Sequence, residues 1–322
     1  MGELRWEAPT GAADGAWVEL LGAIEEVDRR GEVVGPEDVA DEWASLWSHP
    51  ETDALFVWDG GDLVAFGWIK TLVGEREHHR VECWGGVRPS HRRRGIGRDL
   101  LRRQVARARE IAVRIPGDLP VRIGLEAGDH QTDLLALATR AGFSPERRFL
   151  EIARPVSEPV APPTAPAGLR LVPWDEAWDE RIRVAHTETF AGHWGTEPRT
   201  PQEWRQWYTG HRGFRPDLSY IAEDEGRDEV AGFVLAAAYP NDWDSCPREA
   251  WIHTLGTRPA WRGRGIARWL LTRTLGAVAD ADDGFEQTIL GVDAENPTGA
   301  LCLYRSLGFV DVRATLRLGL QP

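Results

Sequence analysis

The sequence predicts an α/β (α+β) protein made of two similar domains, each built on a sheet with flanking helices. One block of motifs occurs twice, and β-type and helical runs follow each other in a similar order in both halves. The length supports this class, because 322 residues exceed one ordinary core and suit two domains.

The repeat is clearest in two blocks. GVRPSHRRRGIGRDLL (86–101) matches GTRPAWRGRGIARWLL (256–271), and RAGF (140–143) matches SLGF (306–309). Their shared order and spacing indicate an internal duplication. Between the halves, RPVSEPVAPPTAPAG lacks apolar periodicity and predicts an extended connector. We therefore expect domains at residues 1–154 and 169–322, joined by a linker at 155–168.

The elements of the second half follow from its apolar spacing. A polar turn between two β-type runs predicts a hairpin, and helical spacing after Gly265 predicts a long helix. The order β-α-α-β-β-β-α-β-α-β is expected at residues 169–173, 176–190, 202–208, 219–223, 230–238, 249–257, 265–279, 287–292, 298–306 and 310–318. The first half gives a similar order, with its hairpin at 54–58 and 63–72.

Composition narrows the function. A net charge of −13 disfavours nucleic acid as a partner and favours a cationic small molecule such as an amine, although it could simply maintain solubility. No apolar run is long enough to span a bilayer, and we see no signal peptide. Cys83, Cys246 and Cys302 fit neither a disulfide framework nor a zinc site. We expect a cytoplasmic monomer or homodimer without a metal or a membrane partner.

The repeated block predicts an anion-binding loop. The first backbone N–H groups of a helix lack internal partners, and small residues let a phosphate approach them closely. Flanking arginines add charge. The spacing is neither a P-loop nor a dinucleotide fingerprint, and the overall charge disfavours a nucleic-acid patch. The pattern Arg-x-x-Gly-x-Gly/Ala falls on Arg92, Gly95 and Gly97, and on Arg262, Gly265 and Ala267.

Together with the downstream Asn, Tyr and Gly-Phe, these motifs resemble the GNAT superfamily of N-acetyltransferases over well more than half of the chain. The resemblance implies two tandem domains, each with a central mixed, mostly antiparallel sheet, and acetyl-CoA as co-substrate. In the second half the implied coenzyme-binding residues are Leu255, Thr257, Arg262, Gly263, Arg264, Gly265, Ile266, Ala267, Arg268 and Asn296. In the first half they are Val87, Arg92, Arg93, Arg94, Gly95, Ile96, Gly97 and Arg98.

The halves differ where the resemblance places the chemistry. Tyr304 is expected near the departing sulfur, and the matching residue of the first half is Ala138, which has no proton to donate. Asn296 likewise corresponds to His130. A phenol with a pKa near about 10 can hydrogen-bond to a leaving thiolate, whereas the alternative is that Tyr304 only packs the last strand. We expect catalysis in the C-terminal domain.

The sequence offers candidates for the general base and for the acceptor site but does not decide between them. The glutamate frequent in the family falls on Trp251, so His253 is the candidate base and Glu249 the reserve; His253 could equally be structural. The sixteen tryptophans could line a pocket or fill cores. Candidate acceptor-binding residues are His193, Trp194, Glu197 and Trp251.

The doubled arrangement resembles tandem GNAT proteins of the mycothiol synthase type, whose C-terminal half is catalytic. Because Trp251 departs from their glutamate, the resemblance does not extend to their acceptor. We expect acetyl transfer from acetyl-CoA to the amine of a small molecule, by direct attack in a ternary complex. The alternatives are a non-catalytic acyl-CoA sensor or scaffold, and a protein N-acetyltransferase.

Overall fold

The computed structural model describes residues 3–31, 33–73, 77–161, 163–194, 196–240, 243, 247–296 and 298–322. Cys246 lies outside these ranges. The chain forms two compact units, Met1–Arg148 with Ala314–Pro322, and Phe149–Arg313. Each unit contains a mixed sheet with helices against it, which confirms the expected fold class.

The N-terminal unit has the sheet order β1-β2-β3-β4-β5-β12, in which only β4 and β5 pair in parallel. Its elements are β1 (Arg5–Glu7), α1 (Asp14–Asp28), α2 (Pro36–Trp43), α3 (Pro50–Asp53), β2 (Ala54–Asp59), β3 (Asp62–Leu72), β4 (His79–Val87), α4 (Ile96–Arg114), β5 (Val121–Gly128) and α5 (Thr132–Arg140).

The C-terminal unit has the order β6-β11-β10-β9-β8-β7, with β10 and β11 as its parallel pair. Its elements are β6 (Ser144–Pro155), β7 (Leu169–Pro173), α6 (Asp179–Thr189), α7 (Pro201–Trp204), β8 (Phe214–Asp224), β9 (Glu229–Ala238), β10 (Glu249–Thr257), α8 (Ile266–Asp280), β11 (Gln287–Asp293), α9 (Ala300–Arg305) and β12 (Val310–Leu320). Of β6 only the part from Phe149 onward belongs to this unit, and of β12 only the part up to Arg313. The predicted element order is confirmed, but the second predicted helix is the single turn α7 followed by a π-helical turn, Arg205–Thr209.

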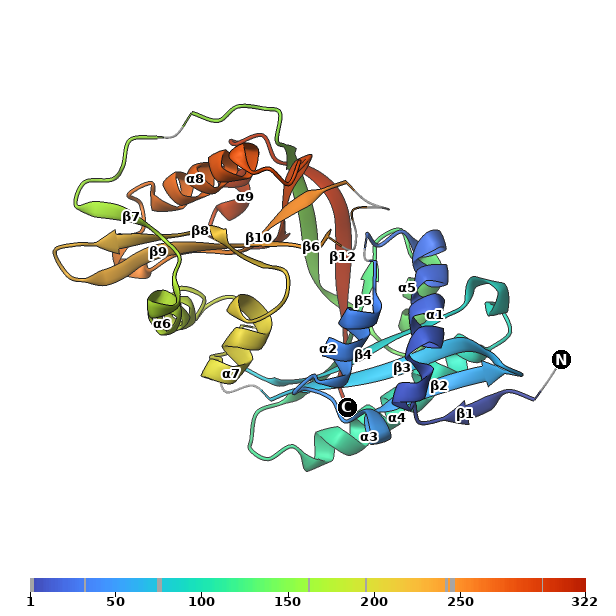
Figure 1. Ribbon diagram of the computed structural model, residues 1–322. Coiled ribbons are helices and arrows are strands. Elements are labelled where there is room, and N and C mark those ends of the chain that lie inside the picture. The colour runs from blue at the N-terminus through green and yellow to red at the C-terminus, as the bar shows by residue number, and fades with distance from the viewer. Residues whose placement is uncertain are drawn as a thin grey trace. The chain divides into compact units, whose positions relative to one another are not determined.

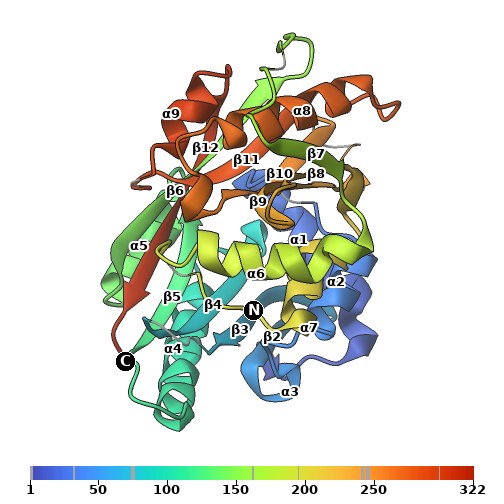
Figure 2. The same cartoon turned by 90° about the vertical axis from the view of Figure 1, so that its left-hand side faces the viewer.

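Helices cover both faces of the C-terminal sheet, with α6 on one face and α8 on the other (Figures 1 and 2). Alternation along β9 explains the two layers, because successive side chains of a strand point to opposite faces. Phe233 and Leu235 pack with α6, whereas the small side chains of Ala236 and Ala238 pack with α8. None of the helices in the described ranges is both long and apolar enough to cross a bilayer.

The face of the N-terminal sheet under α1 is filled by aromatic rings. Trp17 of α1 is fully buried and stacks on Trp68 with ring centroids 4.6 Å apart. Phe56 and Phe66 pack edge-on or tilted against the same indole. Most of this cluster is apolar, and it forms the core between α1 and the sheet.

The last strand of each half is counted with the other unit. Residues Phe149–Pro155 of β6 pair with β11, and Thr315–Leu320 of β12 pair with β5. Leu318 is 1% exposed and packs in the cluster that contains Ile123 and Leu125. The compact units therefore divide at Arg148 and Arg313. The boundaries 154 and 169 follow the duplicated sequence, and as limits of independently folding domains they stay a prediction.

Candidate active site

A glycine-bearing loop joins β10 to α8 in the C-terminal unit. Gly263 and Gly265 adopt φ values of +77° and +78°, a conformation that strains other residues. No atom lies within 4 Å of where a Cβ would stand at either glycine. The first N–H groups of α8 have no acceptor within the helix, so the loop offers donors beside open space. These residues fit a phosphate group.

The N-terminal unit keeps the same backbone between β4 and α4. Gly95 has a φ of +87°, and Arg93, at the position of Gly263, has a φ of +62°. A positive φ at a residue other than glycine costs on the order of 1 kcal/mol or more. The loop conformation has thus been retained although one of its glycines has been lost.

The first arginine of each loop is used inside the protein. Arg262 donates from Nε to the carbonyl oxygen of Thr257 at 3.3 Å and from Nη2 to that of Thr189 at 3.0 Å. Arg92 donates to the carbonyl oxygen of Val87 at 3.0 Å and forms a bidentate pair with Asp28. Both side chains tie the loop to the end of a preceding helix. A direct contact between either arginine and a phosphate group stays a prediction.

The remaining loop arginines lie at the entrance to each helix. Arg264 donates to the carbonyl oxygen of Ala167, and Arg268 to the hydroxyl of Ser306, which brings the end of α9 beside the first turn of α8. In the N-terminal unit, Arg93 pairs with Asp133, Arg94 donates to Ser90 and Arg98 lies 3.6 Å from Asp99. Ile266 and Ile96 are buried beneath their loops, and the small residues Ala267 and Gly97 follow them.

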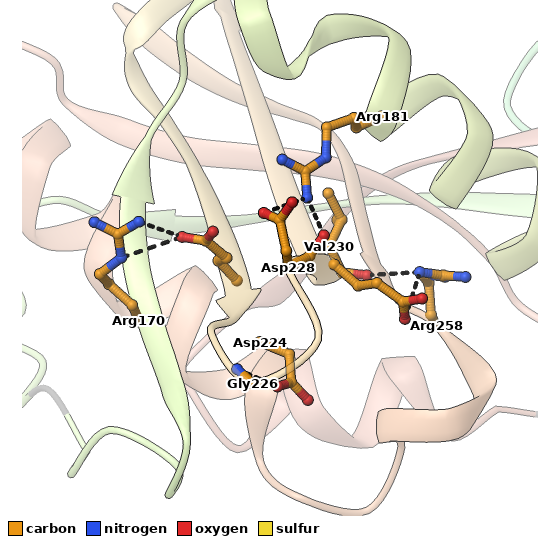
Figure 3. A network of polar contacts seen from close by, with 9 residues as sticks. Arg170, Arg181, Asp224, Gly226, Asp228, Val230 and Arg258 are labelled. Atoms are coloured by element: carbon orange, nitrogen blue, oxygen red, sulfur yellow. Dashed lines mark hydrogen bonds and ion pairs between the residues drawn. The ribbon is translucent and has the colours of Figure 1, made fainter.

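A polar network anchors the segment just before the C-terminal loop (Figure 3). Arg258 donates to the carbonyl oxygen of Val230 at 3.2 Å and pairs with Glu188 of α6 at 2.7 Å and with Glu229 at 3.6 Å. Arg181 pairs with Asp228 at 3.1 Å at the same hairpin turn. Figure 3 shows Arg258 directed at β9, so β9, α6 and the loop are joined through one guanidinium group.

The N-terminal unit repeats this anchor. Arg88 donates to the carbonyl oxygen of Leu63 at 3.2 Å and pairs with Glu19 of α1 at 3.1 Å. Both arginines also receive the same backbone support, because the N–H of Arg88 donates to Val64 and that of Arg258 to Ala231. The duplication therefore includes the support of the loop.

The parallel strands of each unit separate next to the loop. β10 pairs with β11 only from Glu249 to Trp251, although both strands continue beyond that point. β4 and β5 pair only from His79 to Glu82. The backbone of Leu255 and Thr257 is thus not occupied by β11 and can bind an extended ligand arm. The parallel strands separate in this way in both units.

β10 differs from β4 in one respect. The register between β9 and β10 shifts between Ile252 and Thr254, which makes His253 the extra residue of a β-bulge. β4 pairs with β3 in one unbroken register. The residue of β4 that matches His253 is Cys83, which is buried, and burial raises the pKa of its thiol to about 12.

Histidine and tyrosine side chains gather around the bulge. Nε2 of His211 lies 3.3 Å from Nδ1 of His253, and the ring of Tyr208 lies 5.1 Å from that of His253. The Tyr208 hydroxyl lies 3.2 Å from Nε2 of His186 on α6. Burial and the nearby charge of Arg199 lower the pKa of His186 to about 3. Sequence reasoning missed His211, because this residue reaches β10 from a loop 42 positions earlier.

Asn296 and His193 meet beside the same strand ends. Nδ2 of Asn296 lies 3.2 Å from Nε2 of His193, and Oδ1 of Asn296 accepts from the N–H and hydroxyl of Thr298. Burial and the positive charge of Arg262 lower the pKa of His193. A predicted coenzyme-binding residue and a predicted acceptor-binding residue are therefore in contact.

Tyr304 lies on α9 and is 8% exposed. Burial raises the pKa of its phenol to about 12, so the hydroxyl keeps its proton at neutral pH. Its ring packs edge-on against Phe309, 6.0 Å between centroids. The described residues provide no hydrogen-bond partner for this hydroxyl, which is available to a ligand.

The structure does not place Glu249 beside Leu255, where the thioester is expected. It lies six residues from Leu255 on an extended strand, about 20 Å along the chain. Gln287 donates to its Oε1 at 2.6 Å, and burial raises its pKa. Trp251 is half-buried on β10 and donates to Glu249. Trp194 packs 6.2 Å from Phe149 in the C-terminal unit, and Glu197 is half-buried before α7.

The separated parallel strands beside a glycine-bearing helix entrance can hold an extended ligand with a phosphate group, as an acyl-coenzyme A-dependent acyltransferase requires. The acetyltransferase (GNAT) family model matches residues 19–143 and 179–309, so the chain belongs to the GNAT family of acetyltransferases. At the family level its reaction is the transfer of an acetyl group from acetyl-CoA to an amine. The resemblance found in the sequence is confirmed, including its tandem form.

Curated relatives are mycothiol acetyltransferases. The protein of Brachybacterium faecium is 32% identical over 72% of this chain and 68% of its own length. That of Salinispora arenicola is 29% identical over 69% of this chain and 67% of its own length.

Solved structures share the fold. A GCN5-related N-acetyltransferase from Sphaerobacter thermophilus has a TM-score of 0.77 at 24% identity, covering 99% of this chain and 95% of that one. A tandem GNAT protein from the clavulanic acid biosynthesis pathway has a TM-score of 0.76 at 18% identity, covering 99% and 98%.

Proposed function

We propose that the C-terminal unit transfers an acetyl group from acetyl-CoA to the amine of a small molecule, in a ternary complex in the cytoplasm. The observation that carries this assignment is the bulge at His253, which is surrounded by polar side chains in the C-terminal unit only. The N-terminal unit retains the loop, but its β4 has no bulge and carries the buried Cys83 at the position that matches His253.

The coenzyme would lie along the separated part of β10. Backbone groups of Leu255 and Thr257 would bind the thioester and pantetheine portion, and Asn296 would lie beside that arm. The N–H groups from Gly263 to Arg268 would bind the pyrophosphate. The open space beside both loop glycines and the unpaired edge of β10 support this placement.

The reaction is a direct displacement. The amine lone pair forms a bond to the carbonyl carbon while the π electrons move to oxygen, and collapse breaks the C–S bond. The nitrogen releases one proton to water, and the thiolate later takes one proton from water, so protons balance. A phenol with a pKa of about 12 is a weaker acid than a thiol near about 8.5, so Tyr304 stabilises the leaving thiolate as a hydrogen-bond donor.

The acceptor is a small-molecule amine, in keeping with the relatives named for mycothiol acetylation. His193, Trp194 and Glu197 precede α7 and would line the acceptor site with Trp251. Because a tryptophan stands where the family frequently has a glutamate, we propose no particular acceptor. His253 stands at the reacting end of β10, whereas Glu249 lies too far along the strand to act there.

A calorimetric titration with acetyl-CoA tests the assignment of the site. Ala267→Glu and Gly97→Glu place a carboxylate at equivalent positions in the first helical turn of α8 and α4, without altering a positive φ. We expect Ala267→Glu to abolish both the binding of acetyl-CoA to the C-terminal unit and the acetylation of a panel of amines. We expect Gly97→Glu to preserve both. Turnover lost only in Gly97→Glu would place the active site in the N-terminal unit. Binding without turnover in wild type would indicate a sensor.

A further inference from the structure

A chain of hydrogen bonds fixes the protonation state of His253. The backbone N–H of Gly213 donates to Nδ1 of His211 at 3.0 Å. Nε2 of His211 lies 3.3 Å from Nδ1 of His253. His211 is in the loop before β8, and its ring also stacks 6.0 Å from that of Tyr239. Both histidine rings are therefore held by neighbours on two sides.

The direction of the chain follows from its first member. A backbone N–H can only donate, so Nδ1 of His211 must present its lone pair. A neutral imidazole carries one N–H, which must then be on Nε2 of His211 and must donate to Nδ1 of His253. Nδ1 of His253 accepts this bond, so the single proton of a neutral His253 is on Nε2. The free nitrogen of His253 is a donor.

The surroundings keep His253 neutral. Burial, the charge that His211 would carry if protonated, and the charge of Arg199 lower the pKa of His253 to about 3. Within the described part of the chain, the other titratable groups that face it are Tyr208 from the π-helical turn and His186 from α6. A neutral imidazole with this pKa is a poor base for an ammonium group but remains a hydrogen-bond donor.

We propose that His253 is a neutral hydrogen-bond donor to the carbonyl oxygen of the thioester, that it does not accept the proton of the amine, and that His211 is the positioning residue that sets its tautomer. The proposal rests on the proposed function, because it assumes that the thioester lies along the separated part of β10. His253 stands at the bulge, two residues before Leu255, and its Nε2 is directed away from His211.

The donor has a clear chemical task. Negative charge develops on the carbonyl oxygen as the amine attacks, and a donor fixed before the reaction stabilises that charge without reorganisation. Removal of one such donor typically lowers kcat about a hundred- to a thousand-fold. The role requires a proton on Nε2 throughout the reaction, which the Gly213–His211–His253 chain provides.

Nitrogen NMR tests the tautomer without any turnover. In the full chain labelled at histidine nitrogens, with the His253 signals assigned by their loss in His253→Gln, we expect a protonated Nε2 and a lone pair on Nδ1. This pattern should not titrate between pH 5 and 8, and His211→Ala should convert it into a mixture of tautomers. A proton on Nδ1, or titration near pH 6.5, would overturn the proposal.

Kinetics test the role. Glutamine can donate from its amide nitrogen but cannot act as a base at neutral pH. We expect His253→Gln to keep kcat within about tenfold of wild type, and His253→Ala to lose about a hundred- to a thousand-fold in kcat with KM for acetyl-CoA nearly unchanged. Equal losses in both variants would overturn the donor role. An inactive wild type with the expected NMR pattern would refute the proposed function while leaving the tautomer established.

Discussion

At the scale of single residues, two buried side chains carry most of the chemistry that can be tested. Tyr304 has a phenol whose pKa burial raises to about 12, and no described side chain hydrogen-bonds its hydroxyl. His186 is 4% exposed and shares a hydrogen bond with Tyr208. In the proposed function the Tyr304 hydroxyl hydrogen-bonds the departing sulfur, whereas the buried His186 can be tested through the stability of the C-terminal unit.

Replacement of Tyr304 by Phe should lower kcat about a hundred- to a thousand-fold and leave acetyl-CoA affinity unchanged, because only a hydrogen-bond donor to the departing thiolate is lost. An assay of the free thiol released from acetyl-CoA would measure kcat, and calorimetry would measure the affinity for acetyl-CoA. Tyr220→Phe is a matched control, since its hydroxyl makes only a weak 3.4 Å bond to Asp217. Unchanged turnover in Tyr304→Phe would remove the phenol from the mechanism.

Acid should destabilise the C-terminal unit through His186. Its folded pKa of about 3 is below the unfolded value near 6.5, so the unfolded chain binds the proton first as pH falls. Above pH 6.5 His186 does not change the free energy of unfolding with pH. Between pH 6.5 and the folded pKa of about 3, the free energy of unfolding falls by about 1.4 kcal/mol per pH unit. Thermal unfolding from pH 7 to 4 should show a smaller decline for His186→Phe than for wild type. The exposed His49→Gln should follow wild type.

At the scale of elements, the loop between β10 and α8 depends on the arginine before it. Arg258 joins β9, α6 and the loop, and Arg88 does the same in the N-terminal unit. Both arginine side chains are 20% exposed, but Glu188 and Glu19 are 41% and 72% exposed, so solvent screens the ion pairs and the hydrogen bonds to the backbone contribute more of the anchoring.

Replacement of Arg258 by Met should raise the dissociation constant of acetyl-CoA and lower stability by about 1–3 kcal/mol, the cost of lost charge-assisted hydrogen bonds. Urea unfolding and calorimetry would measure both. Arg305→Met is the control: its pair with Asp311 is half-exposed and should contribute about 1 kcal/mol or less. Arg88→Met should reduce stability equally and spare turnover; loss of turnover there would show that catalysis needs the N-terminal loop.

The local sequence pattern predicted the helices and strands, whereas the bulge and the contacts between distant residues depend on long-range pairing that the pattern does not show. β10 has the predicted limits, and α8 lies within one residue of them, because alternation and helical spacing are local properties. The bulge at His253 could not be predicted, since it depends on the register with β9. The approach of His211 to His253, and the pairing of β12 with β5, likewise join residues far apart in sequence.

At the scale of the whole molecule, the C-terminal segment is part of the N-terminal unit. Deletion of Ala314–Pro322 should therefore unfold the sheet around β5 while leaving the interior of the C-terminal unit protected. Hydrogen exchange would show this as lost protection in Val121–Gly128. Removal of Gln321 and Pro322 alone, both exposed, should have no effect. Protection that is lost first in β10 and β11 would contradict the assignment of the strand.

This assignment of the last strand also bears on how the protein is made. A ribosome releases the chain from its N-terminus, and β12, the partner strand of β5, emerges long after β5 because most of the C-terminal unit lies between them in the sequence. The sheet of the N-terminal unit therefore stays incomplete, with the edge of β5 exposed, until β12 has emerged. Chains stalled before β12 emerges should remain sensitive to proteases around β5, and a stop codon ahead of β12 should damage a sheet that is encoded mainly in the first half of the sequence.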